Sequence, residues 1–196
     1  PPVPSSRDVD RYETCGETHN TCTSRGKGIP RGRIVDDLVS FIDLAPTFLE
    51  LAGCDRWPEI TGSSLCSLIQ ARGSGRLEPQ RRWVLSGRER HTHARPDNLG
   101  YPSRAIRTHQ FLYIRNFAPE RWPAGGEFHD IDACPSLTFL LRHADTPQGS
   151  FFLEASVGKR PSEECFDILK DPACMHNLAG EPGYATLVDQ LGDLLM

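Results

Sequence analysis

The residues best suited to chemistry lie in one arginine- and histidine-rich stretch, residues 88–98. It reads Arg-Glu-Arg-His-Thr-His-Ala-Arg-Pro-Asp-Asn and has too few apolar side chains to belong to a core. Arginine forks suit bidentate contacts to sulfate or carboxylate oxygens. We therefore predict that Arg90, His91 and Arg95 bind an anionic group on a ligand. The alternative is a solvated surface loop with incidental charges.

Two further polar groups could be considered for a metal. His91 and His93 point the same way if the segment is extended, but no third ligand follows at a credible spacing. His129, Asp130 and Asp132 form another cluster, for which a hydrogen-bonding role in a turn is the expected one. The sequence therefore predicts no metal site.

The chain offers no recognisable nucleophile. Ser86 and Ser103 lack both the strand–turn–helix context of a nucleophile elbow and an identifiable base. We expect no catalytic residue of the serine-hydrolase type.

Composition limits the classes of function. With 196 residues, 38% of them hydrophobic, and with 17 Gly and 16 Pro, the chain can build one modest core with many turns. A net charge of -4 argues against a dedicated nucleic-acid binder. No window reaches the roughly 20 apolar residues of a membrane helix, and no N-terminal signal peptide is visible. We predict neither a nucleic-acid partner nor a membrane span.

The cysteines do not identify the redox compartment. They are odd in number and contain no C-x-x-C pair, which removes the strongest zinc signature. Cys165 could pair with Cys174, and Cys15 with Cys22, across small loops; unpaired, half-buried thiols are the alternative. The seven are Cys15, Cys22, Cys54, Cys66, Cys134, Cys165 and Cys174.

The first ordered element predicted is a short apolar strand running into a compact helix, over residues 39–53. Asp43 is placed to cap the helix, and Pro46 falls in its first turn, where a missing N–H costs nothing. Gly53 suits a left-handed stop. The helix should pack on a core through the apolar side chains of Phe48, Leu51 and Ala52.

The remaining elements predict an α+β fold, a small antiparallel sheet with packed helices. A turn and short helix are expected over residues 57–69 and another short helix near 137–143. Strands are expected at residues 82–86, 104–108, 111–117 and 164–169. In the third, apolar side chains point to both faces, which is typical of a central strand covered on both sides. An amphipathic C-terminal helix over residues 184–195 should lie on the sheet.

Four blocks, in collinear order, resemble the C-terminal portion of the sulfatase family, and most closely its heparan N-sulfatase (N-sulfoglucosamine sulfohydrolase)-like branch. Together they cover roughly residues 28–196. The blocks are Val39–Gly53; Glu89–His91 with Tyr101–Thr108 and Phe111–Asn116; Phe128–Asp132 with Cys134-Pro135; and Arg160–Asp167 with Asp171-Pro172 and Asn177–Ala179.

The resemblance also shows what this chain lacks. Sulfatases need a Cys or Ser in a C-x-P-x-R context that becomes formylglycine, oxygen ligands for a calcium-type cation, and Lys and His for the leaving group. In Cys134-Pro-Ser-Leu-Thr138 the Pro follows Cys directly and no Arg is supplied. In the family those elements precede the segment that matches residues 39–53. Most of the N-terminal α/β catalytic domain is therefore expected to be missing.

The resemblance implies a fragment of a hydrolase of sulfate esters or sulfamates on carbohydrates such as glycosaminoglycans, inactive and without a cofactor by itself. Calcium is implied for the intact enzyme. The expected partners are a sulfated carbohydrate and the missing N-terminal sulfatase domain. A non-catalytic anionic-glycan-binding module and a non-functional truncated remnant remain open. The family implies a periplasmic, secreted or lysosomal location.

The resemblance also implies an organisation along the chain. Residues 1–28 would be an irregular or disordered arm. Residues 29–80 would end the catalytic-domain region, and residues 81–196 would form the C-terminal subdomain.

Overall fold

A computed structural model describes residues 24–90, 96–125, 131 and 134–196. Two compact units emerge from the contacts within the described chain. The helical unit comprises residues 24–85 and 107–109, and the sheet unit comprises residues 86–106 and 110–196. The predicted boundaries at residues 28 and 80 remain predictions.

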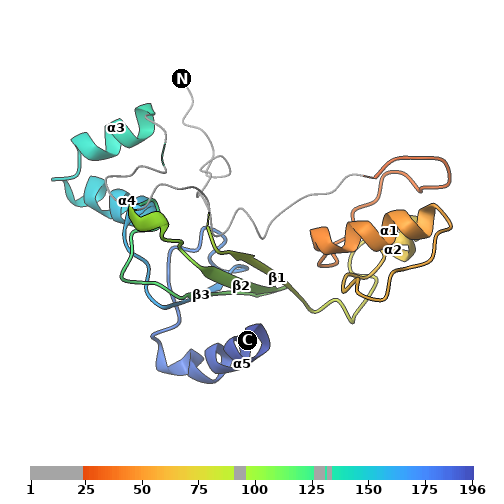
Figure 1. The fold of residues 1–196 in the computed structure, drawn as a ribbon. Coiled ribbons are helices and arrows are strands. Elements are labelled where there is room, and N and C mark those ends of the chain that lie inside the picture. Colours follow the sequence, from red (N-terminus) through yellow and green to blue (C-terminus); the bar gives the residue numbers. More distant parts are fainter. Residues whose placement is uncertain (1–23, 91–95, 126–130, 132–133) are drawn as a thin grey trace. The chain divides into compact units, whose positions relative to one another are not determined.

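The helical unit is built from three short helices (Figure 1). They are the 3-10 turn η2 (Phe41–Asp43), α1 (Leu44–Leu51) and α2 (Cys66–Gln70). The prediction of a strand before α1 was wrong. The Asp43 carboxylate accepts a hydrogen bond from the Ser40 amide at 3.1 Å, which curls this segment into a turn. The short helix predicted after residue 57 is confirmed as α2, with Leu65 and Leu68 buried.

The ends of α1 are only partly as predicted. Asp43 occupies the N-cap position, but its side chain makes no capping bond to α1. Pro46 lies in the first turn, and Gly53 follows the helix with a φ of 68°. This left-handed conformation favours glycine, so the predicted stop is confirmed.

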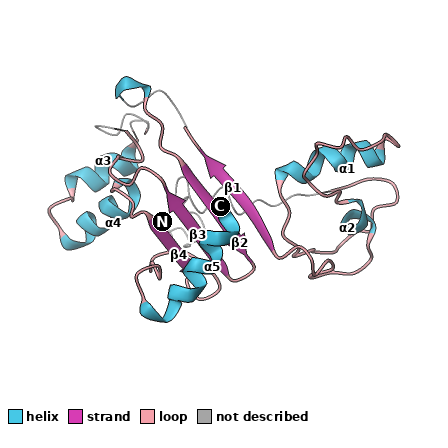
Figure 2. Ribbon diagram, turned by 60° about the horizontal axis from the view of Figure 1, so that its bottom comes forward, coloured by secondary structure: helices cyan, strands magenta, loops and turns pink. Residues whose placement is uncertain are grey.

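A four-stranded antiparallel sheet, with the strands in chain order, lies for the most part in the sheet unit (Figure 2). The strands are β1 (Trp83–Arg88), β2 (Ser103–Thr108), β3 (Phe111–Asn116) and β4 (Glu163–Asp167). Strands β2 and β3, which the sequence predicts, are neighbours in the sheet and form a hairpin. In the β3–β4 register Tyr113 lies opposite Cys165, and Arg115 lies opposite Glu163.

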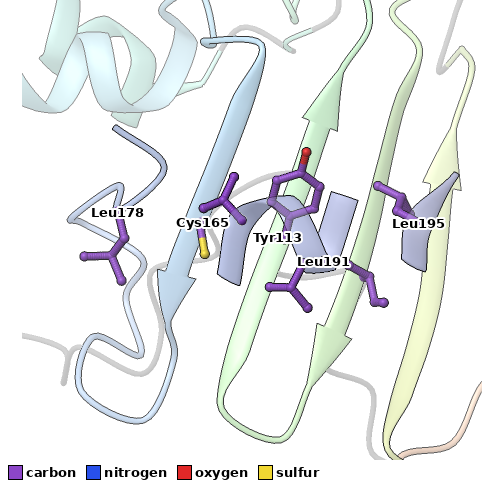
Figure 3. Packing of buried hydrophobic residues seen from close by; sticks show 7 residues of the cluster. Tyr113, Cys165, Leu178, Leu191 and Leu195 are labelled. Atoms are coloured by element: carbon purple, nitrogen blue, oxygen red, sulfur yellow. The ribbon is translucent and has the colours of Figure 1, made fainter. Parts of the chain in front are cut away.

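Strand β3 is central and covered on both faces, as its sequence predicts. Leu112, Tyr113 and Ile114 are each at most 1% exposed. On one face the core is closed by α5 (Ala185–Leu195), which follows the 3-10 turn η5 (Pro182–Tyr184) (Figure 3). This core consists of Ile106, Tyr113, Cys165, Leu178, Val188, Leu191 and Leu195.

The second core contains Ala105, Leu112, Ile114, Phe166 and Cys174. Cys165 belongs to the first core and Cys174 to the second. Neither forms a disulfide, nor do the other described cysteines, Cys54, Cys66 and Cys134. The Cys165–Cys174 pairing considered from sequence is therefore wrong, and Cys15 and Cys22 lie outside the described residues.

Two helices follow β3 before the chain returns as β4. They are α3 (Pro135–Arg142), which the sequence predicted, and α4 (Pro147–Val157), which it did not. The Thr146 hydroxyl caps α4 by accepting from the Gly149 amide at 3.0 Å. A Cβ at position 149 would overlap the His143 carbonyl, so this tight turn requires glycine. A further 3-10 turn, η3 (Pro96–Asn98), precedes β2.

Among the helices in the described part of the chain, none combines the length and the apolarity that crossing a membrane would take.

Candidate functional site

The arginine-rich stretch connects β1 to β2, and its described part is anchored at the base. Arg90 is exposed, and its guanidinium donates hydrogen bonds to both the side-chain and the main-chain oxygen of Asn98. The Tyr101 amide donates to the Glu89 carbonyl at 3.0 Å. A Cβ at Gly100 would overlap the same carbonyl. The two ends of this connection are thus held together by Arg90 and by close backbone approach.

Backbone geometry explains why the sequence allows this closure. Asp97 and Asn98 both have a φ of 55°. Asn and Asp tolerate the left-handed region better than other non-glycine residues. The Asn98 carbonyl and side chain are thereby turned toward Arg90, which fixes this guanidinium in place.

A second arginine, Arg104, lies near the base of this connection. Arg104 on β2 forms an exposed ion pair with Glu89 at 3.2 Å, and its guanidinium lies 5.2 Å from the centre of the Phe117 ring. An exposed pair of this kind contributes little to stability. Its effect is to keep two arginines, Arg90 and Arg104, close to the base of the connection.

The other predicted members of this site cannot be placed. His91, His93 and Arg95 lie outside the described residues, so binding by His91 and Arg95 remains a prediction. The cluster of His129, Asp130 and Asp132 also lies outside them. In the described ranges, no group of three or more His, Cys, Asp or Glu side chains is arranged to hold a metal ion.

A second polar group lies on β3 and β4. The Tyr113 hydroxyl donates to Glu163 Oε1 at 2.6 Å, and Arg115 Nη1 donates to the same oxygen at 2.9 Å. Burial, and then the hydrogen bond to Glu163, raise the pKa of Tyr113 above its usual value. A hydroxyl with a raised pKa stays neutral, so this group holds the strands together rather than supplying a base.

The pKa values of two other side chains of β4, Cys165 and Asp167, are shifted by their surroundings. Burial raises the pKa of the Cys165 thiol to about 11, which makes it a poor nucleophile. The hydrogen bond from Gln110 Nε2, 2.9 Å long, is the main reason why the pKa of Asp167 is lowered. The Asp167 carboxylate also accepts the Leu169 and Lys170 amides, each at 3.2 Å. It fixes the turn after β4.

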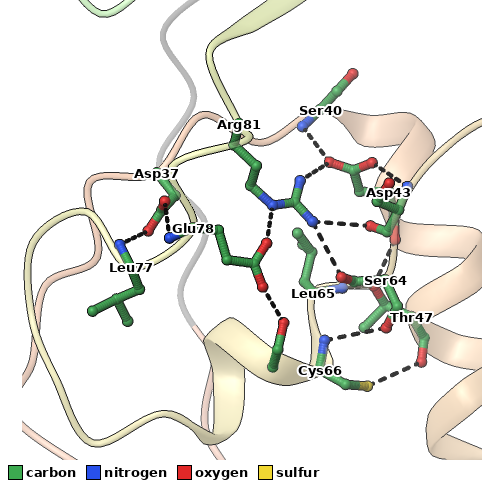
Figure 4. Close-up of polar contacts among 12 residues, drawn as sticks. Asp37, Ser40, Asp43, Thr47, Ser64, Leu65, Cys66, Leu77, Glu78 and Arg81 are labelled. Carbon is green, nitrogen blue, oxygen red and sulfur yellow. Dashed lines mark hydrogen bonds and ion pairs between the residues drawn. The ribbon is translucent and has the colours of Figure 1, made fainter.

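The helical unit contains a polar network centred on Asp43 and Arg81 (Figure 4). Buried Asp43 accepts the Ser63 amide at 2.7 Å and forms an ion pair with Arg81 at 2.9 Å. Arg81 also pairs with Glu78 at 2.6 Å. The Thr47 hydroxyl donates to the Asp43 carbonyl at 2.5 Å and accepts the Leu65 amide at 2.8 Å. These groups are mutually satisfied, so the network stabilises the unit.

The described residues therefore form an α+β unit with an arginine-bearing connection between two strands. They do not form a complete catalytic centre. No family model matches the chain. The sequence is 29% identical over 170 residues to an ulvan-active sulfatase of Formosa agariphila, which covers 84% of this chain and 29% of that protein. A second ulvan-active sulfatase of the same organism is 28% identical, over 79% of this chain and 24% of its own length.

The chain is therefore similar in sequence to these two sulfatases. The matches do not single out the N-sulfatase-like branch. The chain spans less than a third of the length of either relative.

Two solved structures align with part of this fold. One is a protein in complex with its substrate D-glucosamine-2-N,6-O-disulfate, at 22% identity and a TM-score of 0.47. A second is a putative sulfatase from Bacteroides thetaiotaomicron, at 20% identity and a TM-score of 0.46. Each alignment covers 78% of this chain and 22% of the other chain.

Proposed function

We propose that this chain is part of a sulfatase-like hydrolase of sulfate esters or sulfamates on carbohydrates, and that it supplies structure and a ligand-facing connection rather than the nucleophile. The observation that carries the proposal is the sequence relation to two ulvan-active sulfatases over about four fifths of the chain. The absence of a C-x-P-x-R segment from the sequence supports the second half of the proposal.

The ligand-binding part of the proposal rests on Arg90, His91 and Arg95. A sulfated carbohydrate offers oxyanions, and guanidinium groups bind oxyanions through charge-assisted hydrogen bonds. Arg90 in the structure is already bonded to Asn98, which orients its guanidinium. Calcium and the formylglycine chemistry would belong to the rest of the enzyme. The N-sulfatase-like branch remains part of the proposal through the resemblance of the four sequence blocks.

A chimera tests this function. The segment of the Formosa agariphila ulvan-active sulfatase that aligns with this chain would be replaced by residues 28–196, and sulfate release from ulvan and from N-sulfoglucosamine would be measured. We expect release by the chimera and none by the isolated 196-residue chain. Release on N-sulfoglucosamine as well would favour the N-sulfatase-like branch. A folded chimera that releases no sulfate from either substrate, or turnover by the isolated chain, would contradict the proposal.

Two variants of the chimera separate the roles of Arg90. If Arg90 contacts the ligand, Arg90→Ala should raise KM about tenfold or more, because a charge-assisted hydrogen bond is lost. Asn98→Ala should then have a smaller effect. Equal effects of the two variants would show that Arg90 acts only by closing the connection. Arg142→Ala, on α3, is the control for loss of one positive charge.

A second candidate, a non-catalytic module for anionic glycans, is favoured by one observation in the helical unit. An open hollow of about 880 Å³ is lined by Lys27 and Arg72 together with Gln70 and apolar residues, and by no carboxylate. Binding of sulfated oligosaccharide by the isolated chain, weakened by salt and by Arg72→Ala, would support this module. Binding unaffected by both would exclude this hollow as the site.

A further inference from the structure

In helix α1 a polar side chain is buried and apolar side chains are exposed, which is the reverse of the usual pattern for a surface helix. Its polar Thr47 is 2% exposed, whereas its apolar Phe48 and Leu51 are 63% and 58% exposed. The predicted packing of Phe48, Leu51 and Ala52 on a core is therefore wrong within the described chain. The burial pattern was misread because the Thr47 hydroxyl has two hydrogen-bond partners inside the unit, which turn this polar side inward and leave the apolar side chains largely exposed.

The exposed stripe continues across the preceding turn. Phe41, Ala45, Phe48 and Ala52 recur at helical spacing, and all are exposed. Ile42 and Leu51 widen the stripe, so that Glu50 is the only charged exposed side chain of η2 and α1. A contiguous apolar outward side of this kind is typical of a surface that another part of a protein covers. We call the stripe the η2–α1 face: Phe41, Ile42, Ala45, Phe48, Leu51 and Ala52.

Contacts on the opposite side of η2 and α1 fix the direction in which the η2–α1 face points. Asp43 and Thr47 tie η2 and α1 to the segment 63–65 through the buried hydrogen bonds already described. Cys66 Sγ lies 3.8 Å from the Thr47 carbonyl. A Cβ at Gly62 would overlap the Ile42 carbonyl, so the backbone also packs closely there. Rotating α1 to hide Phe48 inside the helical unit would break these contacts, so the η2–α1 face points away from the interior of that unit.

We propose that the η2–α1 face is the surface on which this chain docks against the catalytic remainder of a sulfatase-like enzyme. This inference rests on the proposed function. Its occupant follows from length and chemistry. The chain spans 29% and 24% of its two sulfatase relatives, so most of such an enzyme lies outside it. An apolar face with one charge suits a permanent interface better than a transient, polar one.

Thiol labelling tests the face directly. Phe48→Cys would be made in the isolated chain and in the ulvan-sulfatase chimera, with labelling at each position quantified by mass spectrometry. Phe139→Cys on α3 is the matched control, since Phe139 is 61% exposed. We expect position 48 to label as fast as Cys54 in the isolated chain and at least tenfold slower in the chimera. Position 139 should label equally fast in both.

Three results would overturn the proposal. The first is equally fast labelling of position 48 in the folded chimera. The second is slow labelling in the isolated chain at every concentration, because the chain would then cover the face itself. The third is slow labelling that appears only as the isolated chain is concentrated, because a second copy would then be the occupant. Leu51→Cys gives an independent reading if the Phe48 variant does not fold.

The outcome stays separate from that of the proposed function. Sulfate release is measured on the chimera that retains Phe48. Slow labelling at position 48 without sulfate release would keep the docking surface and contradict the enzyme assignment. Sulfate release together with fast labelling at position 48 would support the enzyme assignment and contradict the docking surface.

Discussion

Helices α1 and α5 carry the same kind of apolar spacing, and only α5 buries it within the described chain. Val188, Leu191 and Leu195 of α5 close a core with Tyr113 and Cys165 of the sheet. In α1 the buried residues are Pro46 and Thr47. Periodicity identifies the apolar side of a helix, whereas what covers that side depends on the partners available to it.

The two helices also differ in how they are attached. Helix α5 is held by apolar packing, helped by Gly192, which lets the helix approach the Tyr113 hydroxyl closely. Helix α1 is held by hydrogen bonds and by the Asp43–Arg81 ion pair beneath it. A surface helix with a polar underside and an apolar outside is the arrangement expected when the outside belongs to an interface.

The largest expected effect is at the polar underside of α1. Asp43→Ala removes one of the two carboxylates that pair with the largely buried Arg81 guanidinium and leaves the Ser40 and Ser63 amides without their acceptor, and it should cost about 3–5 kcal/mol of the free energy of unfolding. Hydrogen exchange at the Ser63 and Leu65 amides during urea unfolding reports on the helical unit. Phe48→Ala, in the η2–α1 face, should change stability by less than about 0.5 kcal/mol.

If Phe48→Ala proves as costly as Asp43→Ala in the isolated chain, the contrast between the two sides of α1 would be lost.

Helix α5 should show the opposite pattern. Leu191→Ala removes a side chain that is 3% exposed and should cost about 2–5 kcal/mol. Leu194→Ala, three residues away and half exposed, should cost under about 1 kcal/mol. Both are measured by urea unfolding of the sheet unit. Similar values for the two variants would mean that α5 does not pack as described.

The turn after β4 should make the sheet unit sensitive to acid. The folded pKa of Asp167 is lowered, so its contribution to stability is present above the unfolded pKa and is lost as the pH falls through the folded value. Asp167→Asn should therefore flatten the fall in unfolding midpoint between pH 5 and the acid limit. An unchanged pH profile would show that Asp167 is not held by Gln110 and the turn amides.

The smallest effect is a difference in reactivity with no change in stability. Exposed Cys54 should react with a thiol reagent at neutral pH, and Cys165 should not react until the sheet unit unfolds, since it is fully buried with a pKa of about 11. Site-resolved mass spectrometry after a timed pulse of reagent distinguishes them. Early modification of Cys165 would contradict the described core.

Much of the sheet unit could be predicted from sequence because its signals are local. The apolar run of β3 and the spacing in α5 each specify both an element and its burial. Helix α4 was missed because its apolar residues follow no clear period, so the Thr146 cap and Pro147 were its main signals. The turn η2 was misread as a strand because a run of apolar residues does not reveal the bond between Ser40 and Asp43.

The candidate site could be predicted only in part. An arginine-rich connection between strands is visible in the sequence, and Arg90 is where that connection begins. The partner of Arg90, Asn98, could have been suspected from the Asp-Asn pair after Pro96, since both residues tolerate positive φ. The Asp43–Arg81 pair joins residues 38 positions apart, and a distant pair of this kind leaves no local pattern.

The most direct test of the account is to read the genomic DNA immediately upstream of the codon for Pro1. We predict an in-frame extension that encodes a C-x-P-x-R segment and, before it, acidic residues able to bind a calcium-type cation. A stop codon in that frame, with no such segment nearby, would contradict the assignment of this chain to a working sulfatase.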